Sequence, residues 1–221
     1  MARLPVYQRI LEELLRSGTS TVSSELLGAA AQLNAAKVRK DLSLLGSFGT
    51  RGSGYDVAFL VEQIDRQLGL DREWAVVIAG IGNLGRALAR SQGFAARNFR
   101  VAALVDTDPD IIGEQIDGVV VRHPDALPAI VKEVPLAIGV ITTPGPVAQR
   151  VADLLVDAGV RSLLNFAPQV LEVPAGILLR YVDLSIELQV MSFYQARQMD
   201  DEAGASMPVI RSVGRSPGSA R

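Results

Sequence analysis

The feature that most constrains the fold is the alternation of short apolar runs with helical segments in the second part of the chain. The apolar runs cover residues 74–80, 100–106, 118–121, 136–142, 162–167 and 178–182, and amphipathic segments at 83–94, 125–134 and 146–159 separate them, with a short helix expected at 109–113. Strands that are apolar along their whole length are typical of parallel sheets covered on both faces. The order predicts an α/β, Rossmann-like, doubly wound parallel sheet.

A glycine run lies where the first of these strands meets its helix. Gly80 allows a tight turn, Gly82 allows a pyrophosphate to approach the backbone, and Gly85 allows close helix–strand packing. The phosphates would lie at the helix N-terminus. The candidate nucleotide-binding residues of this loop are Gly80, Ile81, Gly82, Asn83, Leu84 and Gly85.

Asp106 ends the second strand, at the position of the acid that binds the adenosine ribose in dinucleotide-binding sheets. Its charge would repel a 2′-phosphate, so the sequence favours NAD(H) over NADP(H). A mononucleotide or coenzyme A pocket on the same fold stays open as an alternative.

Residues that could catalyse a reaction on a bound dinucleotide are hard to find in this sequence. Cysteine is absent, the only histidine is His123 in a polar turn where we expect a surface residue, and neither Tyr181 nor Tyr194 begins a Tyr-x-x-x-Lys pair. We therefore assign no catalytic and no metal-binding residue and expect a protein that binds NAD(H) without turning it over. An oxidoreductase with a helical appendage is the alternative.

The first segment, to about residue 70, predicts helices and one hairpin. Helices are expected at 4–17, from a cap at Ser23 or Ser24 to 31, at 35–45 after a cap at Asn34, and at 57–70, with two short strands around a tight turn in the glycine-rich run 46–57. This order is that of a winged helix.

Basic residues gather on the third of these helices and at the hairpin tip. Such side chains suit the acceptor-rich major groove and the phosphates of DNA. The alternative is a small helical subdomain with a solvated basic face. The candidate DNA-binding residues are Lys37, Arg39, Lys40, Ser43, Arg51 and Gly52.

The final helix, from Asp183 to Met199, is apolar nearly all round, which favours burial in a partner subunit. We predict four regions: a winged-helix domain (1–72), a Rossmann domain (73–182), the dimerisation helix (183–199) and a disordered tail (200–221). The start of the chain lacks the pattern of a signal peptide and no apolar run is long enough to span a membrane, so we expect a cytoplasmic protein.

Four stretches resemble the family of the redox-sensing transcriptional repressor Rex. They are VRKDLSLLGSFGTRGSGYDV (38–57), VIAGIGNLGRAL (77–88), VDTDP (105–109) and NFAPQVLEVP (165–174), and the likeness runs from about Tyr7 to Arg197. The first stretch is the most specific of the four.

The resemblance implies a homodimeric repressor that binds double-stranded operator DNA when NADH is low and leaves it when NADH binds, with respiratory and fermentative genes as targets. It implies that the basic residues above contact DNA, that the glycine loop and Asp106 bind the dinucleotide, and that the last helix is swapped between subunits. It further implies that Asp183 pairs with Arg9 in one state of the switch. Ser91 and Leu184 stand where some relatives carry aromatic residues at the nicotinamide.

Overall fold

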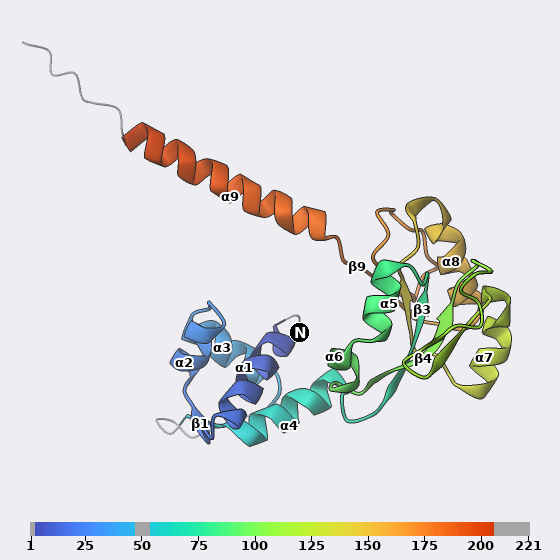
Figure 1. Ribbon diagram of the computed structural model, residues 1–221. Coiled ribbons are helices and arrows are strands. Elements are labelled where there is room, and N and C mark those ends of the chain that lie inside the picture. Colours follow the sequence, from blue (N-terminus) through green and yellow to red (C-terminus); the bar gives the residue numbers. More distant parts are fainter. Residues whose placement is uncertain (1–2, 47–53, 206–221) are drawn as a thin grey trace, which may run out of the picture.

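The computed structural model describes residues 3–46 and 54–205. Its first part is a small helical unit with one short pair of strands (Figure 1). The elements are α1 (Leu4–Arg16), β1 (Thr21–Val22), α2 (Ser24–Ala30), α3 (Ala35–Ser43), β2 (Tyr55–Asp56) and α4 (Val57–Leu68). All four helices expected in this region are therefore confirmed, and their ends differ from the expected ones by no more than one or two residues.

Side-chain caps explain where these helices begin. The Ser23 hydroxyl accepts from the backbone N–H of Leu26, and the Asn34 side chain accepts from that of Lys37. The C-terminal end of α4 is set by Gly69, which has φ +71°, a left-handed conformation that suits glycine. Leucine, valine and isoleucine side chains from all four helices, with Tyr7, form one buried core.

Of the hairpin predicted at 46–57, the described residues include one strand, β2. β2 pairs antiparallel with β1, with Thr21 opposite Asp56 and Val22 opposite Tyr55. The strand β1 was not predicted, because a two-residue strand is defined only by its distant partner. The first strand and the turn of the predicted hairpin lie at 47–53, outside the described residues, as do the wing candidates Arg51 and Gly52.

The second part is a seven-stranded sheet in the order β5-β6-β4-β3-β7-β8-β9. Its strands are β3 (Trp74–Ala79), β4 (Phe99–Val105), β5 (Gln115–Ile116), β6 (Val119–Arg122), β7 (Ile138–Ile141), β8 (Ser162–Asn165) and β9 (Leu178–Tyr181). All neighbours pair in parallel except β5 with β6. The predicted doubly wound Rossmann-like sheet is confirmed.

Helices cover both faces of the sheet (Figure 1). They are α5 (Asn83–Ala89), α6 (Gln92–Ala95), α7 (Leu127–Glu133) after a short 3-10 turn η1 (Pro124–Ala126), and α8 (Gly145–Asp157). Successive side chains of β3 enter different cores: Val77 packs in the cluster that contains α7 and α8 residues, and Ile78 packs with Ala89 of α5. This alternation explains why β3 is apolar throughout.

Three details of this part differ from expectation. The helix predicted at 83–94 breaks between α5 and α6, at Arg90 and Ser91. The segment 109–113 forms turns rather than a short helix. It leads into β5, a strand that the sequence analysis missed and that folds back on β6.

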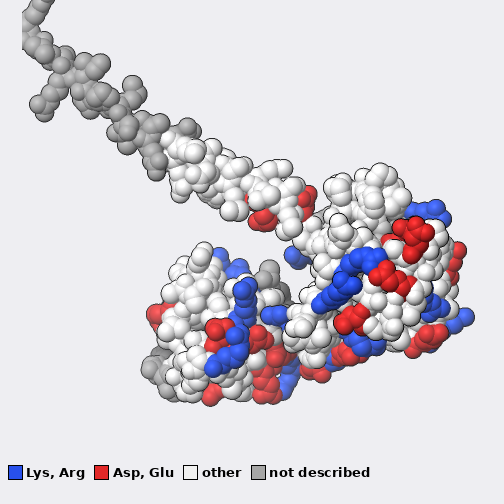
Figure 2. All heavy atoms as spheres, in the orientation of Figure 1, with Lys and Arg blue, Asp and Glu red and all other residues white. Residues whose placement is uncertain are grey.

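The last element, α9 (Leu184–Ala205), projects away from the rest of the chain (Figure 1). Every side chain from Asp183 to Met199 is exposed, and in the view of Figure 2 the helix shows almost no charge beyond acidic atoms at its start. The helix continues to Ala205, into the segment predicted to be disordered, and residues 206–221 lie outside the described part. Within the described ranges, no helix combines the length and apolarity needed to cross a membrane.

Candidate functional site

The three glycines of the loop differ in what a side chain would meet. A Cβ on Gly85 would lie 2.0 Å from the carbonyl oxygen of Gly80, and a Cβ on Gly80 would lie 2.8 Å from Thr143 Cγ2. Gly80 also has φ +96°. Around Gly82, by contrast, no atom lies within 4 Å of such a Cβ. Protein atoms therefore leave no room for a side chain at Gly80 and Gly85, whereas the space beside Gly82 is open.

The loop lies at the point where the order of the strands in the sheet reverses, between β3 and β7. The helix after β3 contributes to one core and the helix after β7 to the other, so α5 and α8 lie on opposite faces of neighbouring strands. Ligands of open α/β sheets bind in the crevice at such a point, outside the carboxyl ends of the strands. Gly82, the N-cap residue of α5, offers no side-chain acceptor to the first turn, which leaves its N–H groups for a ligand.

Asp106 is brought to this loop by the parallel pairing of β3 and β4, in which Ala79 lies opposite Val105. One carboxylate oxygen accepts from the backbone N–H of Ile81 at 2.5 Å, and the other accepts from that of Asp108 at 2.9 Å. The structure thus joins the two parts of the predicted dinucleotide site, the glycine run and the acid.

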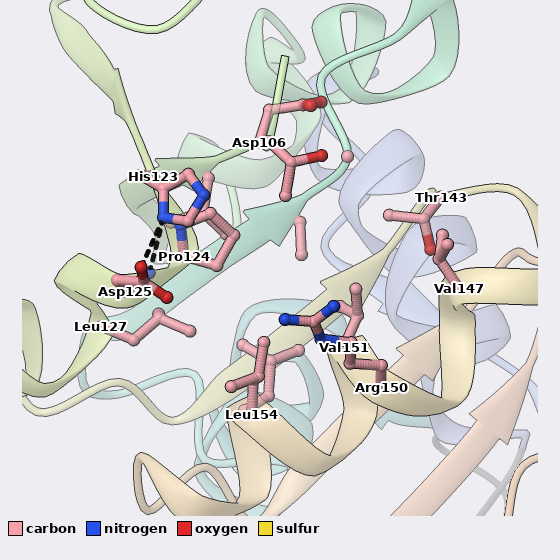
Figure 3. A pocket seen from close by; sticks show the side chains of 15 residues that line it. Asp106, His123, Pro124, Asp125, Leu127, Thr143, Val147, Arg150, Val151 and Leu154 are labelled. Atoms are coloured by element: carbon pink, nitrogen blue, oxygen red, sulfur yellow. Dashed lines mark hydrogen bonds and ion pairs between the residues drawn. The ribbon is translucent and has the colours of Figure 1, made fainter. Parts of the chain in front are cut away.

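Beside Asp106 lies a cavity of about 320 Å³ (Figure 3). In Figure 3, Arg150 of α8 lies across the cavity from His123 and Asp125, which follow β6. Its lining is apolar between these polar groups, with Ala79, Val105, Leu127, Val147, Val151, Leu154 and Leu155. An apolar slot with a few polar groups at its rim is typical of a small-molecule site.

His123 is exposed, as expected from the sequence, and it also lines this cavity. Its side chain is 46% exposed, and Nδ1 lies 3.1 Å from a carboxylate oxygen of Asp125, whose backbone N–H is 3.3 Å from the same nitrogen. The histidine is thus both at the surface and at the rim of the cavity. The signal that could have placed it there is its position directly after a strand of the parallel sheet.

Two threonines at the end of β7 complete the crevice and were missed from the sequence. The Thr142 hydroxyl donates to the carbonyl oxygen of Gly80 at 2.6 Å and so holds the loop. The Thr143 hydroxyl is buried and has no hydrogen-bond partner among the described residues. A buried hydroxyl without a partner is costly. This hydroxyl, the open side of Gly82 and the Asp106 carboxylate fit a bound dinucleotide.

The residues of α3 that are predicted to contact DNA, three basic and one a serine, lie exposed, while Val38 and Leu42 of the same helix are buried. The exposed ones are Lys37, Arg39, Lys40 and Ser43. The guanidinium of Arg39 also contacts α2, donating to Ser24 Oγ at 2.9 Å and to Glu25 Oε1 at 3.1 Å.

A polar cluster beneath this surface was not anticipated. Asp41 of α3 receives two hydrogen bonds from Arg3, at 2.6 and 2.5 Å, and one from the Tyr7 hydroxyl at 2.8 Å. The hydrogen bonds from Arg3 lower the pKa of Asp41 to about 2, and burial raises the pKa of Tyr7 to about 12. The cluster ties α3 to α1, so it fixes the direction in which the basic face points.

The residues of the expected switch lie apart from each other in the described chain. Arg9 is exposed on α1, and no ion pair joins it to Asp183 within residues 3–46 and 54–205. Asp183 instead accepts from the hydroxyl and the backbone N–H of Ser185, and these bonds lower its pKa. Ser91 lies at the break between α5 and α6, and Leu184 begins α9 with 71% exposure.

No group of three or more histidine or carboxylate side chains that could hold a metal ion occurs in the part of the chain that the structure describes.

Comparison with known protein families gives two matches. Residues 71–169 match the family described as CoA binding domain, and residues 1–43 match the family described as putative DNA-binding protein N-terminus. The first match covers the crevice described above, and the second covers the helical unit up to the end of α3.

Similar proteins of known name extend over nearly the whole chain. A redox-sensing transcriptional repressor Rex of Streptomyces coelicolor is 56% identical over 100% of this chain and 87% of its own length. A crystal structure of RSP with β-NAD+ and operator DNA is 33% identical, with a TM-score of 0.85 over 94% of this chain and 96% of that one. RSP with β-NADH is 32% identical, with a TM-score of 0.83 over 91% and 95%, and RSP is a Rex-family repressor. The chain belongs to the Rex family of redox-sensing transcriptional repressors.

Proposed function

We propose that the protein is a DNA-binding repressor that senses the NADH/NAD+ ratio and leaves its operators, in respiratory and fermentative genes, when NADH binds. The observation that carries this is the hydrogen bond between Asp106 and the N–H of Ile81, which joins the ribose acid to the glycine loop. The same chain carries an exposed basic helix. The named relatives are repressors, and the RSP structures contain NAD+ with operator DNA or NADH.

The proposed dinucleotide site consists of Gly80–Gly85 and Asp106, with the adenosine end beside the cavity of Arg150 and His123. The proposed DNA surface consists of the basic residues of α3 and Ser43, with Arg51 and Gly52. In this proposal, residues 1–72 form the domain that binds DNA, and residues 73–182 form the domain that binds the dinucleotide.

The apolar helix α9 supplies the argument for a homodimer. The large apolar side chains of Ile186, Leu188 and Phe193 are between 53% and 65% exposed, on a helix that contacts little of its own chain. A contiguous apolar surface of this kind marks an interface. We propose that the α9 helices of two copies are exchanged, and that Asp183 of one copy then approaches Arg9 of the other in one state.

The switch must read the nicotinamide ring, since NAD+ carries a positive charge there and NADH does not. We propose that the neutral ring lets the exchanged helices and the two sheet domains close, which moves the two α3 helices apart. Half-sites one turn of DNA apart require recognition helices about 34–36 Å apart, so a modest rotation prevents simultaneous contact. Nearly complete switching requires about 5.5 kcal/mol of differential binding, which two sites can share.

Gel shifts on an operator fragment test the direction of the switch. We expect NADH to weaken DNA binding and NAD+ to leave it intact. The opposite pattern would show that the direction is wrong. Monitoring NADH fluorescence during the same titration separates NADH binding from a coenzyme A site, and constant nucleotide absorbance in the presence of keto acids or aldehydes argues against an oxidoreductase.

The pair Arg39–Glu25 offers a matched control for the DNA surface. Arg39→Ala removes a cation from α3 and is expected to weaken operator binding about tenfold, with NADH binding retained. Glu25→Ala breaks the same 3.1 Å ion pair but leaves the cation, so DNA binding should be unchanged or tighter. Equal losses in both variants would indicate that the pair only stabilises the helical unit.

A further inference from the structure

Arg86 directly follows the glycine run and is held by a carboxylate from another part of the chain. It lies in the first turns of α5, where its backbone N–H bonds to the carbonyl oxygen of Gly82. Its guanidinium makes two parallel hydrogen bonds to Glu114, Nη1 to Oε1 at 2.5 Å and Nη2 to Oε2 at 2.7 Å. This two-point geometry is the strong form of an arginine–carboxylate pair.

Glu114 reaches Arg86 because the segment after β4 folds back on itself. The segment begins at Asp106 and returns through turns to Glu114, whose carbonyl oxygen accepts from the N–H of Val121 in β6. Asp106 therefore joins the start of the segment to the glycine loop, while Glu114 joins its end to α5. The two carboxylates therefore lie at the two ends of one segment, which they fix to the glycine loop and to α5.

The charges around Arg86 support this placement. Its pKa is raised first by the hydrogen bonds to Glu114, and Asp106 and Asp108 raise it further through their charges. Glu114 has its pKa lowered by the same hydrogen bonds from Arg86. The guanidinium thus lies within the electrostatic reach of the acid that we assign to the adenosine ribose.

We propose that Glu114 withholds Arg86 from the 2′-phosphate of NADP(H), so that the pair acts with Asp106 to select NAD(H). This inference rests on the proposed function. In NADP-binding members of this fold an arginine near the ribose accommodates the 2′-phosphate. A guanidinium binds phosphate through two adjacent N–H groups, and in this chain one N–H on each terminal nitrogen of Arg86 donates to Glu114, whose negative charge also offsets that of the guanidinium.

The test compares NADPH and NADH binding, followed by nucleotide fluorescence, in the full chain and its variants. Glu114→Ala frees the guanidinium and is expected to tighten NADPH binding about tenfold, the effect of one charge-assisted hydrogen bond, while NADH binding changes less than about twofold. In the double variant R86Q/E114A the gain for NADPH should disappear, because the freed cation is gone.

The pair Glu73–Arg100 provides the matched control. Its ion pair, 2.7 Å long, lies where β3 and β4 begin, at the end of the two strands that is far from the glycine loop. Glu73→Ala should therefore change the affinity for neither NADH nor NADPH. An unchanged NADPH affinity in Glu114→Ala, a gain that persists in the double variant, or a parallel loss of both nucleotides would each overturn the proposal. If the unaltered chain binds NADPH as tightly as NADH, selectivity fails while dinucleotide binding stands; if it binds neither, the proposed function fails as well.

Discussion

The helical unit (3–68) and the sheet (74–181) each present a surface for another molecule, but the contacts that hold the two surfaces differ. Under the basic face of α3, the side chains of Arg3 and Tyr7 hold Asp41 through hydrogen bonds. In the glycine loop, backbone lies against backbone, with no room for a side chain at Gly85. Side-chain contacts can be weakened by degrees, whereas a Cβ on Gly85 would lie 2.0 Å from the carbonyl oxygen of Gly80, so even the smallest side chain does not fit there. The two surfaces should therefore respond differently to substitution.

The largest effect is expected for Gly85→Ala. The added methyl group would overlap the carbonyl oxygen of Gly80, so α5 must shift and the loop must lose its shape. We expect NADH affinity to fall about 100-fold, together with a lower melting temperature in the absence of nucleotide.

Gly82→Ala is the control for this effect. Its methyl group meets no protein atom within 4 Å, so the melting temperature without nucleotide should not change, although the approach of a ligand is hindered. Equal melting temperatures for the two variants would contradict the contrast between a closed and an open glycine.

A moderate effect is expected for Asp41→Asn. The substitution weakens the hydrogen bonds from Arg3 and Tyr7, so the free energy of unfolding should fall by about 1–2 kcal/mol. Operator affinity should fall as well, because α3 loses its connection to α1, while NADH affinity should be retained. Chemical denaturation and gel shifts measure the two effects.

The same variant makes a prediction about pH. The pKa of Asp41 is about 2 in the folded protein, below its ordinary value of 3.8. The stability that the ionised carboxylate contributes is therefore complete above about pH 4 and is lost as the pH falls toward 2. The difference in stability between the unaltered chain and Asp41→Asn should therefore shrink over that interval. A difference that stays constant would show that the charge of Asp41 is not what stabilises the cluster.

The smallest effect is expected for Arg66→Gln on α4. Arg66 donates to Glu62 at 2.7 Å, one turn away, and both side chains are 63% exposed. Such pairs contribute about 0.3–0.5 kcal/mol and less at high salt. Denaturant curves should barely separate this variant from the unaltered chain, and neither surface should be affected.

The elements that could be predicted from the sequence are those with a local cause. The helix α3 follows from the cap at Asn34 and the spacing of Val38 and Leu42, and the sheet follows from the apolar runs between helical segments. The pairing of Asp106 with the glycine loop follows from the order of the first two strands.

The elements that were missed depend on contacts between distant residues. The strands β1 and β5 contain two residues each and are defined only by their pairing with β2 and β6. The pair Arg86–Glu114 spans 28 residues, and the length of the turn between them carries no sequence signal for it. Ser91 and Gly93 gave a hint that the helix of the glycine loop would break, since neither favours a helix interior.

The exposure of α9 also bears on how fast the molecule can finish folding. The helix has 22 residues and is about 33 Å long, and the side chains from Leu184 to Met199 gain almost no burial from their own chain. Helical turns form within microseconds, but on the proposed dimer the final docking of α9 requires an encounter between two chains. That step slows in proportion to dilution, whereas the cores of the sheet and of the helical unit are formed within one chain. A newly made copy would therefore complete its structure only after meeting a second one.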